Sequence, residues 1–209
     1  DIRDAGRIRR IFADEAPELV FHAAALKHVP VVETHIEEGV LTNTIGTRVV
    51  ADACSANDVA AMVLISTDKA VNPSSLMGAT KRIAESYCQA LDIAESSGTG
   101  GTRFVTVRFG NVLGSTGSVV PLFQRQLARG GPLTVTHPDM TRFFMTVREA
   151  VELVLEASVL GLGSDERNGE LYVLDMGEPV RIIDLARQMI LLAGLEPEVD
   201  IRIEITGPR

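Results

Sequence analysis

Short apolar runs alternate along this chain with segments of helical periodicity, and this alternation limits the fold more than any other feature. Three nearly continuous apolar runs of strand length lie at 19–24, 61–66 and 104–108. Helical patterns separate them, over residues 5–15, 40–57 and 77–96. Strands without polar alternation are typical of a parallel sheet that helices cover on both faces. We therefore predict an α/β fold with a doubly wound, Rossmann-like parallel sheet.

The start of such a sheet is not found in this sequence. A doubly wound dinucleotide-binding domain begins with a strand, a Gly-rich turn and a helix whose N-terminus holds a pyrophosphate. No Gly-x-Gly-x-x-Gly turn precedes Asp1, and the glycines at 98–101 follow a helical pattern instead of a strand. We therefore expect an incomplete sheet that begins at about its third strand, with the first strands and the Gly-rich turn absent.

The chain changes character after residue 109. Residues 110–146 are rich in Gly, Pro and Thr, and further elements follow: helices at 120–129, 147–158 and 182–193, and strands at 171–174 and 201–205. We predict that residues 1–109 form a partial dinucleotide-binding domain with the catalytic segment. Residues 110–209 are predicted to form a smaller α/β substrate-binding lobe that partly returns to the first domain.

Charge and composition exclude several classes of function. The formal net charge is -8, so the chain has no general attraction for nucleic acid or anionic membranes. No apolar run approaches the roughly 18 residues that a membrane-spanning helix needs. Cys54 and Cys88 fit neither a disulfide framework nor a metal-ligand spacing, and we expect both to be core residues in a reducing compartment. Because His35 and His137 lack clustered ligands, we predict no metal site.

The densest group of polar residues follows the second apolar run. Thr67, Asp68 and Lys69 come directly after it, and Lys81 lies on the next helical segment. Open α/β sheets bind ligands at the carboxyl ends of their strands. A hydroxyl, a carboxyl and an amine at that edge can exchange protons with a ligand, although the same residues also fit a solvated loop between a strand and a helix.

Five sequence blocks, spread over nearly the whole chain, resemble the extended short-chain dehydrogenase/reductases. They are Phe-His-Ala-Ala-Ala-Leu-Lys-His-Val-Pro at 21–30, Ser-Thr-Asp-Lys-Ala at 66–70, Met-Gly-Ala-Thr-Lys-Arg at 77–82, Arg-Phe-Gly-Asn-Val-Leu-Gly-Ser at 108–115 and Thr-Arg-Phe-Phe-Met at 141–145. Within that family the chain is most similar to the nucleotide-sugar 4,6-dehydratases of bacterial polysaccharide biosynthesis, in the UDP-N-acetylglucosamine branch with membrane-anchored members. The resemblance implies NAD, in preference to NADP, and a UDP-sugar substrate.

One position departs from the usual pattern of the family. Most members have Tyr-x-x-x-Lys, in which the tyrosine takes a hydroxyl proton, whereas this chain has Met77 at the tyrosine position and retains Lys81. Methionine cannot exchange a proton. The long membrane-anchored dehydratases show the same replacement, and the resemblance implies that Thr67 takes over the role of the tyrosine.

The resemblance implies a reaction in three steps. Hydride passes from C4 of the sugar to NAD while Thr67 relays the C4 hydroxyl proton through Lys81 and ribose hydroxyls. Lys69 removes the C5 proton, and Asp68 protonates the departing C6 hydroxyl. Hydride then returns to C6, which gives a 4-keto-6-deoxy sugar.

Cofactor contacts are implied by position as well. Asp1 and Ile2 match an acidic and apolar pair beside the adenine, Asn43 matches a helix residue beneath the sheet edge, and Lys81 would bind the nicotinamide ribose. Three small residues would let the backbone approach the cofactor, although helix-sheet packing explains each of them equally well: Ala23, Ala24 and Ala25. Further cofactor contacts are expected at Ser66, Phe109 and Val112.

Substrate contacts are predicted on both sides of residue 109. Lys27 and His28 lie just past a strand end, where they could face the sugar. Asn111 and Arg142 are predicted at the diphosphate and the uridine, because arginine binds two phosphate oxygens at once. Gln124 and Arg125 are further candidates. His22 is expected to be a hydrogen-bonded structural residue and not a base.

Two other functions stay open. A nucleotide-sugar 4-epimerase of the same fold needs only hydride removal and return at C4, usually with the tyrosine base, so Met77 and the Thr67–Lys69 run favour the dehydratase. A catalytically inactive fragment that binds a nucleotide sugar or a partner would fit the missing Gly-rich turn. We expect a homo-oligomer that associates through the helices at 40–57 and 77–96, in the cytoplasm or at the cytoplasmic face of the inner membrane.

Overall fold

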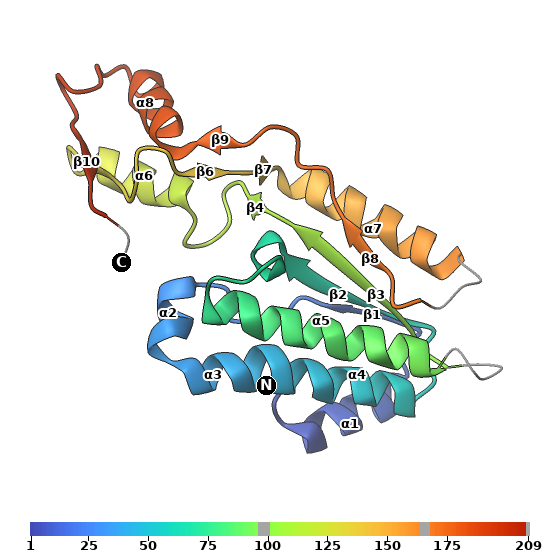
Figure 1. Ribbon diagram of the computed structural model, residues 1–209. Helices are drawn as coiled ribbons and strands as arrows, with labels where there is room; N and C mark the ends of the chain where they lie inside the picture. The colour runs from blue at the N-terminus through green and yellow to red at the C-terminus, as the bar shows by residue number, and fades with distance from the viewer. Residues whose placement is uncertain (96–100, 164–167, 208–209) are drawn as a thin grey trace. The chain divides into compact units, whose positions relative to one another are not determined.

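The chain folds into two compact units, which alternate in sequence. The computed structural model describes residues 1–95, 101–163 and 168–207. Unit 1 comprises Asp1–Phe109 and Val151–Leu174, and unit 2 comprises Gly110–Ala150 and Asp175–Arg209. The predicted α/β fold is confirmed, because unit 1 contains a parallel sheet flanked by helices (Figure 1).

Unit 1 is built on a four-stranded parallel sheet in the order β1-β2-β3-β8. Its strands are β1 (Leu19–His22), β2 (Ala61–Thr67), β3 (Arg103–Phe109) and β8 (Leu171–Val173). The strand β2 pairs with β1 on one side and with β3 on the other. A strand that is paired on both edges and covered on both faces has no solvent-facing positions, which explains its unbroken apolar run.

The helices of unit 1 include short ones at 29–40 that were not predicted, and two of the predicted helices differ from their expected form. The helices are α1 (Ala5–Glu15), α2 (Val29–Thr34), α3 (Ile36–Val40), the π-helical η1 (Leu41–Gly46), α4 (Thr47–Ala56), the 3-10 turn η2 (Asp68–Ala70), α5 (Leu76–Glu95) and α7 (Val147–Gly163), which begins in unit 2. A π-helical turn interrupts the helix predicted at 40–57. The helix α7 continues past the predicted end at residue 158. It crosses β3 closely at Gly161, where a Cβ atom would lie 2.5 Å from Val105 Cγ2.

The two faces of the sheet in unit 1 are covered by different helices. Met62, Leu64 and Phe104 belong to a core that includes residues of α1, α4 and α5. Val105, which points to the opposite face because side chains alternate along a strand, contacts α7. Figure 1 shows α4 and α5 on one side of the sheet and α7 on the other. Cys54 and Cys88 are buried in the core that contains Met62, Leu64 and Phe104, as predicted.

Unit 2 is a smaller α/β unit with three two-stranded pairings. Its elements are β4 (Asn111–Val112), α6 (Val119–Ala128), β5 (Leu133–Val135), β6 (Thr141–Arg142), β7 (Phe144–Met145), β9 (Val180–Arg181), α8 (Ile182–Leu192) and β10 (Ile203–Ile205). The pairs β5–β10 and β4–β7 are parallel, and β6–β9 is antiparallel. The core includes Phe123, Leu133 and Ile190. Strands of two or three residues are too short to show periodicity, so the sequence did not predict most of them.

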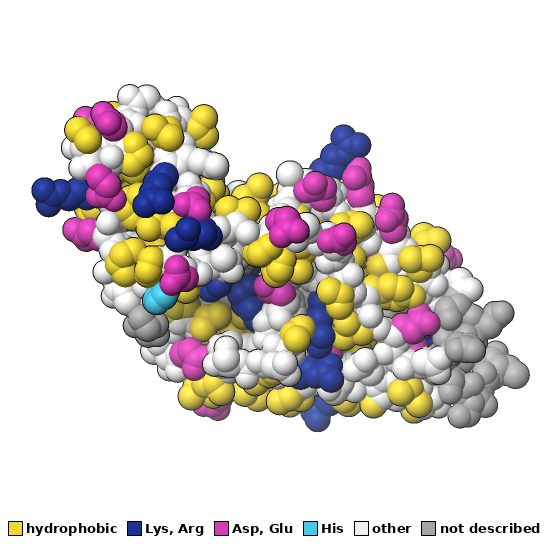
Figure 2. Space-filling model, turned by 45° about the horizontal axis from the view of Figure 1, so that its top comes forward, with side chains coloured by type: hydrophobic (Ala, Val, Ile, Leu, Met, Phe, Trp, Pro, Cys, Tyr) yellow, Lys and Arg dark blue, Asp and Glu magenta, His cyan; other side chains and the backbone are white. Residues whose placement is uncertain are grey.

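Apolar side chains also reach the surface. Val151, Leu155 and Val159, spaced by four residues on α7, are 52%, 50% and 70% exposed. Figure 2 shows apolar side chains interspersed with charged ones on the face that it presents. Within the described ranges, no helix combines the length and the apolar composition that crossing a bilayer requires.

His22 is a buried, hydrogen-bonded residue at the end of β1, as predicted. Its Nε2 lies 2.9 Å from Thr47 Oγ1, and that hydroxyl donates to the carbonyl oxygen of Asn43 at 2.7 Å. Because the only hydrogen of the Thr47 hydroxyl is used in this way, His22 Nε2 is the donor to Thr47. Burial, with a smaller contribution from the charge of Lys81, lowers the pKa of His22 to about 4.

We expect His22 to make the folded chain less stable as the pH falls from 6.5 towards 4. Across this range the unfolded chain binds a proton at His22 that the folded chain excludes, so the free energy of unfolding decreases by about 3 kcal/mol at the acidic end. Urea unfolding of the wild type and of His22→Gln, measured at several pH values, checks this. The variant should lose this part of the pH dependence, and identical slopes for the two proteins would contradict it.

Candidate active site

Three proton-exchanging side chains meet at the carboxyl end of β2. Thr67 ends the strand, and Asp68 and Lys69 begin the turn η2, which Thr67 Oγ1 caps by accepting from the Lys69 N–H at 3.3 Å. Thr67 Oγ1 donates to Asp68 Oδ1 at 2.9 Å, and Lys69 Nζ donates to the same oxygen at 2.8 Å. The side chains of Asp68 and Lys69 are 25% and 29% exposed, so a ligand can reach them. The hydroxyl, carboxylate and amine form one hydrogen-bonded group that can pass protons.

The helix α5 lies against this turn and carries Met77 and Lys81. Met77, at the position where the family usually has tyrosine, is 2% exposed and belongs to the interior. Lys81 is 6% exposed, and its Nζ donates to the carbonyl oxygen of Ile65 at 2.7 Å. Burial lowers the pKa of Lys81 to about 8, although the nearby Glu85 carboxylate acts in the opposite direction. The amine is therefore able to change its charge near neutral pH.

Asn43 holds the loop that follows β1. Its Oδ1 accepts from the Leu26 N–H at 2.7 Å, and its Nδ2 donates to the Leu26 carbonyl at 2.9 Å and to Thr80 Oγ1 at 3.0 Å. The fully buried Asn43 thus pairs with both backbone groups of Leu26, as a neighbouring strand would. Asn43 lies in the π-helical η1, a type of turn that is frequent at functional sites. Ala23 and Ala24 are exposed in the loop that this contact fixes.

Other predicted cofactor residues of unit 1 already have partners. The exposed Asp1 forms an ion pair with Arg3 at 2.6 Å. Ile2 lies against Gly46, where a Cβ atom would come 2.6 Å from Ile2 Cδ1. The hydroxyl of Ser66 lies 2.5 Å from a buried carboxylate oxygen, so it points into the interior. Ala25 and Phe109 are half-buried.

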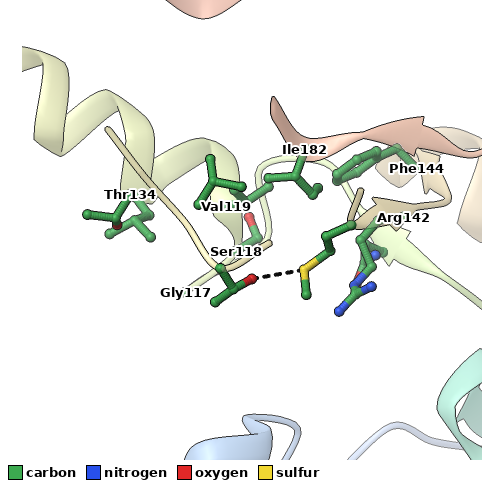
Figure 3. A pocket seen from close by; sticks show the side chains of 12 residues that line it. Gly117, Ser118, Val119, Thr134, Arg142, Phe144 and Ile182 are labelled. Atoms are coloured by element: carbon green, nitrogen blue, oxygen red, sulfur yellow. Dashed lines mark hydrogen bonds between the residues drawn. The ribbon is translucent and has the colours of Figure 1, made fainter. Parts of the chain in front are cut away.

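Unit 2 contains a cavity of about 320 Å³ beside the start of α6 (Figure 3). Its polar lining residues are Asn111, Ser118, Thr134, Thr136 and Arg142. Its apolar lining residues are Val119, Leu122, Val135, Met140, Phe144 and Ile182. Figure 3 shows the Arg142 side chain extending with its guanidinium end away from Phe144. Such a mixture of an apolar wall and a few polar groups is typical of small-molecule sites.

The polar groups of this cavity suit an anion. Ser118 is the N-cap residue of α6, and among the described residues its buried Oγ has no hydrogen-bond partner. Arg142 is half-buried and uses one nitrogen, Nη1, to donate to the Thr141 carbonyl at 2.8 Å. A helix N-terminus beside an arginine attracts phosphate groups. Asn111 completes the polar lining and donates from Nδ2 to the Phe143 carbonyl at 3.2 Å.

Several predicted substrate residues lie outside this cavity. Gln124 and Arg125 are exposed on α6 and do not belong to its lining. Val112, which was predicted as a cofactor contact and not as a substrate residue, is half-buried in β4 and also lies outside the lining. Lys27 and His28 are exposed after β1, in unit 1, and the backbone carbonyl of His28 accepts the first hydrogen bonds of α2.

Sequence reasoning missed three residues around these sites. Glu85 is fully buried on α5 and pairs with Arg108 of β3, with Nη2 and Oε2 2.5 Å apart. A signal for this pair was present, because Arg108 is a charged residue in an apolar strand and Glu85 follows Lys81 by four positions on a helix. Ser118 had no such signal, since only the folded chain shows that its hydroxyl is buried.

The fold and the strand-end residues define the class of this protein. A parallel sheet covered by helices, with polar groups at the carboxyl ends of its strands, is the architecture of dinucleotide-binding α/β proteins. The sequence model of one family, described as "Polysaccharide biosynthesis protein", matches residues 1–209. The chain belongs to this family.

Two curated relatives are similar to this chain over most of its length. The capsular polysaccharide biosynthesis protein CapD of Staphylococcus aureus is 52% identical over 209 residues, which are 100% of this chain and 33% of that protein. A UDP-glucose 4-epimerase of Rickettsia akari is 42% identical over 156 residues, which are 75% of this chain and 44% of that protein. The chain thus spans a third of the length of the first relative and less than half of the second.

Solved structures agree with the fold. Pen from Bacillus thuringiensis matches 100% of this chain and 60% of its own, with a TM-score of 0.87 and 37% identity. The UDP-glucose 4-epimerase of Thermus thermophilus, solved in complex with NAD, matches 100% of this chain and 71% of its own, with a TM-score of 0.81 and 25% identity. The resemblance to the extended short-chain dehydrogenase/reductases is confirmed.

We expect Lys81 to titrate with a pKa of about 8 in the folded chain. Between this value and the ordinary 10.5, the unfolded chain binds a proton that the folded chain excludes, so this group makes the fold more stable as the pH rises. NMR of 13Cε-labelled lysine measures it directly, because the chain has only three lysines, Lys27, Lys69 and Lys81. The signal that disappears in Lys81→Arg should shift with a midpoint near pH 8. A midpoint near 10.5 would show that burial does not act on this amine.

Proposed function

We propose that this chain supplies the acid-base groups and the nucleotide-sugar site of an NAD-dependent 4,6-dehydratase acting on UDP-N-acetylglucosamine in polysaccharide biosynthesis. The observation that carries the proposal is the hydrogen-bonded group of Thr67, Asp68 and Lys69 at the carboxyl end of β2. Elimination of water from a sugar needs a base and an acid close together. This group supplies both, because the Lys69 amine is hydrogen-bonded to an oxygen of the Asp68 carboxyl group. Because the buried Met77 cannot exchange a proton, these residues would take the role of the usual tyrosine.

The residues after β1 fit a nicotinamide dinucleotide. Ala23 and Ala24 are exposed just past the carboxyl end of the strand, and their small side chains leave the backbone open to close approach. Asn43 fixes the loop through Leu26, and Lys81 would hold the nicotinamide ribose. When bound, NAD supplies an acceptor for hydride from C4 and a donor of hydride to C6. NAD is preferred here to NADP on the family resemblance alone.

The hydrogen bonds among Thr67, Asp68 and Lys69 suggest a route for the proton of the C4 hydroxyl. In the proposed route, Thr67 Oγ1 takes this proton as its own proton moves to Asp68 Oδ1, to which it already donates at 2.9 Å. This route replaces the relay through Lys81 that the family resemblance implied. It leaves Asp68 protonated and ready to act as an acid.

The same group then completes the elimination. Lys69, as the neutral amine, takes the C5 proton, which the neighbouring ketone has made acidic, while Asp68 gives its proton to the C6 hydroxyl as it leaves as water. Lys69 afterwards returns a proton to C5. Asp68 is ionised and Lys69 is neutral again at the end, so the cycle closes with one water released and no net change in the protein.

The cavity of unit 2 is the proposed site for the nucleotide end of the substrate. Arg142 and the buried Ser118 hydroxyl, which has no partner among the described residues, would bind phosphate oxygens, and Asn111 adds a further polar group. The apolar lining, which includes Phe144 and Ile182, would receive the flat base. Lys27 and His28 remain proposed contacts of the sugar.

A 4-epimerase is the second candidate, and the similarity to the Rickettsia akari protein of that description favours it. An epimerase removes and returns hydride at C4 alone and leaves C5 untouched. The paired Asp68 and Lys69 would then have no use, because the reaction needs no base at C5 and no acid at C6. Exchange at C5 therefore separates the two functions.

Proton NMR in D2O tests the dehydratase. UDP-N-acetylglucosamine and NAD are incubated with this chain and with a hybrid in which it replaces the matching 209 residues of the Staphylococcus aureus relative. We expect a new C6 methyl signal and deuterium at C5, because Lys69 exchanges its proton with solvent before returning it. Lys69→Ala should reduce formation of the methyl product about 100-fold or more. Signals of a C4 epimer without deuterium at C5 would establish the epimerase, and unimpaired turnover by Lys69→Ala would refute the role of this base.

Calorimetric titration with UDP tests the cavity of unit 2. Arg142→Gln should weaken binding about 10- to 100-fold, because it removes charge-assisted hydrogen bonds to phosphate. Arg125→Gln is the matched control, since Arg125 is exposed on α6 outside the cavity, and it should change the affinity less than twofold. Equal affinities for the two variants would place the nucleotide elsewhere.

A further inference from the structure

One face of α5 contacts the end of β2 and the turn η2 at three points. Gly78 lies so close to the turn that a Cβ atom there would overlap the carbonyl oxygen of Lys69. Lys81 Nζ donates to the Ile65 carbonyl at 2.7 Å. Glu85 Oε1 accepts from the Ser66 hydroxyl at 2.5 Å. Residues spaced by three and four positions share a face of a helix, so α5 follows the segment that carries the proton-exchanging group.

The last of these contacts belongs to a buried charged network. Glu85 is 0% exposed and accepts from Ser66, from Arg82 Nη1 at 3.2 Å, and from Arg108 through both Nε at 2.8 Å and Nη2 at 2.5 Å. Burial alone would raise the pKa of Glu85, but the hydrogen bonds from Arg108 and Ser66 outweigh it and lower that pKa. Glu85 is therefore held as a carboxylate inside unit 1.

Stability alone does not explain this network. Replacing a buried ion pair by apolar residues of similar volume is often neutral or stabilising, because two charges must be removed from water. A bidentate arginine–carboxylate pair, by contrast, fixes both partners in one orientation. Ser66 and Arg108 are also register partners in the pairing of β2 with β3. The carboxylate thus joins α5, β2 and β3 at the residue before Thr67.

We propose that Glu85 is a positioning residue, which acts through Ser66 to hold Thr67, Asp68 and Lys69 in the geometry that proton transfer needs. This role rests on the proposed function, because it assumes that these three residues carry the acid-base chemistry. A displacement of about 1 Å at a reacting group can cost about 100-fold in rate. Ser66 then has a different role from the cofactor contact that its position in the sequence implied.

A measurement without substrate tests the positioning itself. In a chain labelled with 13Cε-lysine, the Lys69 signal, assigned by its loss in Lys69→Arg, reports on the group around Asp68. Ser66→Ala and Glu85→Gln should both shift this signal, whereas the Lys27 signal should not move. Ser86→Ala is the matched control, because Ser86 is exposed, is next to Glu85 and donates to the Arg82 carbonyl within α5. A Lys69 signal that is identical in the wild type and Ser66→Ala would overturn the proposal.

A double-mutant cycle on turnover tests the link through Ser66. In the hybrid enzyme, Ser66→Ala should lower kcat about 10-fold with the KM for the sugar nucleotide and for NAD unchanged within twofold. Glu85→Gln leaves one acceptor oxygen where Ser66 and Arg108 now share two, so it should lower kcat at least as much. Adding Ser66→Ala to it should then cost less than the product of the two single effects, because both changes act on the same contact. Independent effects, in which the two losses of kcat multiply, would overturn the proposal. A raised KM for NAD in Ser66→Ala would also overturn it and would make Ser66 a cofactor contact.

Further measurements distinguish a failure of the positioning role from a loss of folding and from a failure of the proposed function. If Glu85→Gln does not fold, because Arg108 is left as an unpaired buried charge, the conservative Glu85→Asp and the mild Ser66→Ala still decide the matter. Glu85→Asp keeps the charge but shortens the reach, so it should fold and still show the displaced Lys69 signal. A wild-type hybrid with no dehydratase activity would refute the proposed function, while a displaced Lys69 signal in Ser66→Ala would still support the positioning role.

Discussion

Parallel pairing of β2 between β1 and β3 is the constraint on which unit 1 depends. Because parallel strands run in one direction, all their carboxyl ends meet at one edge of the sheet. The alanine loop after β1 and the Thr67–Lys69 group after β2 therefore share that edge, although about 40 residues separate them in the sequence. Burial of both faces makes the strands mostly apolar, so polar groups that a ligand can reach gather where a strand ends.

The helix α5 fixes the geometry of this edge. Its glycine at position 78 allows backbone contact with the turn at Lys69, and two of its buried charged residues, Lys81 and Glu85, each contact β2 or its end. Buried charges are costly unless they are paired, so their presence on one helix face calls for an explanation beyond packing. Lys81 retains a titratable amine at that face, and Glu85 with Arg108 retains a fixed orientation. Unit 1 thus combines a mostly apolar sheet with a few buried, hydrogen-bonded polar groups along α5.

The elements that could be predicted from sequence were those with long periodic patterns. The helices α1, α5, α6 and α8 and the strands β2 and β3 lie within about two residues of their predicted bounds, because burial of one helix face or of a whole strand leaves a clear pattern. The helix α2, the π-helical turn η1 and the short strands of unit 2 other than β10 were not predicted. Their residues have no distinctive spacing, and only contacts with distant residues, such as Asn43 with Leu26, determine their conformation.

The sequence by itself determined the class of fold, the family and the three adjacent polar residues after β2, because each of these depends on patterns within short segments and on the order of those segments along the chain. Only the tertiary structure decided which side chains share a contact. It joined Ser66 to Glu85 and Arg108, paired Asn43 with the backbone of Leu26, and separated Arg142 in the cavity lining from Arg125 on the surface. These outcomes depend on distances between residues far apart in sequence, which local spacing does not contain. The network around Glu85 exists because a buried carboxylate must find donors wherever the fold brings them.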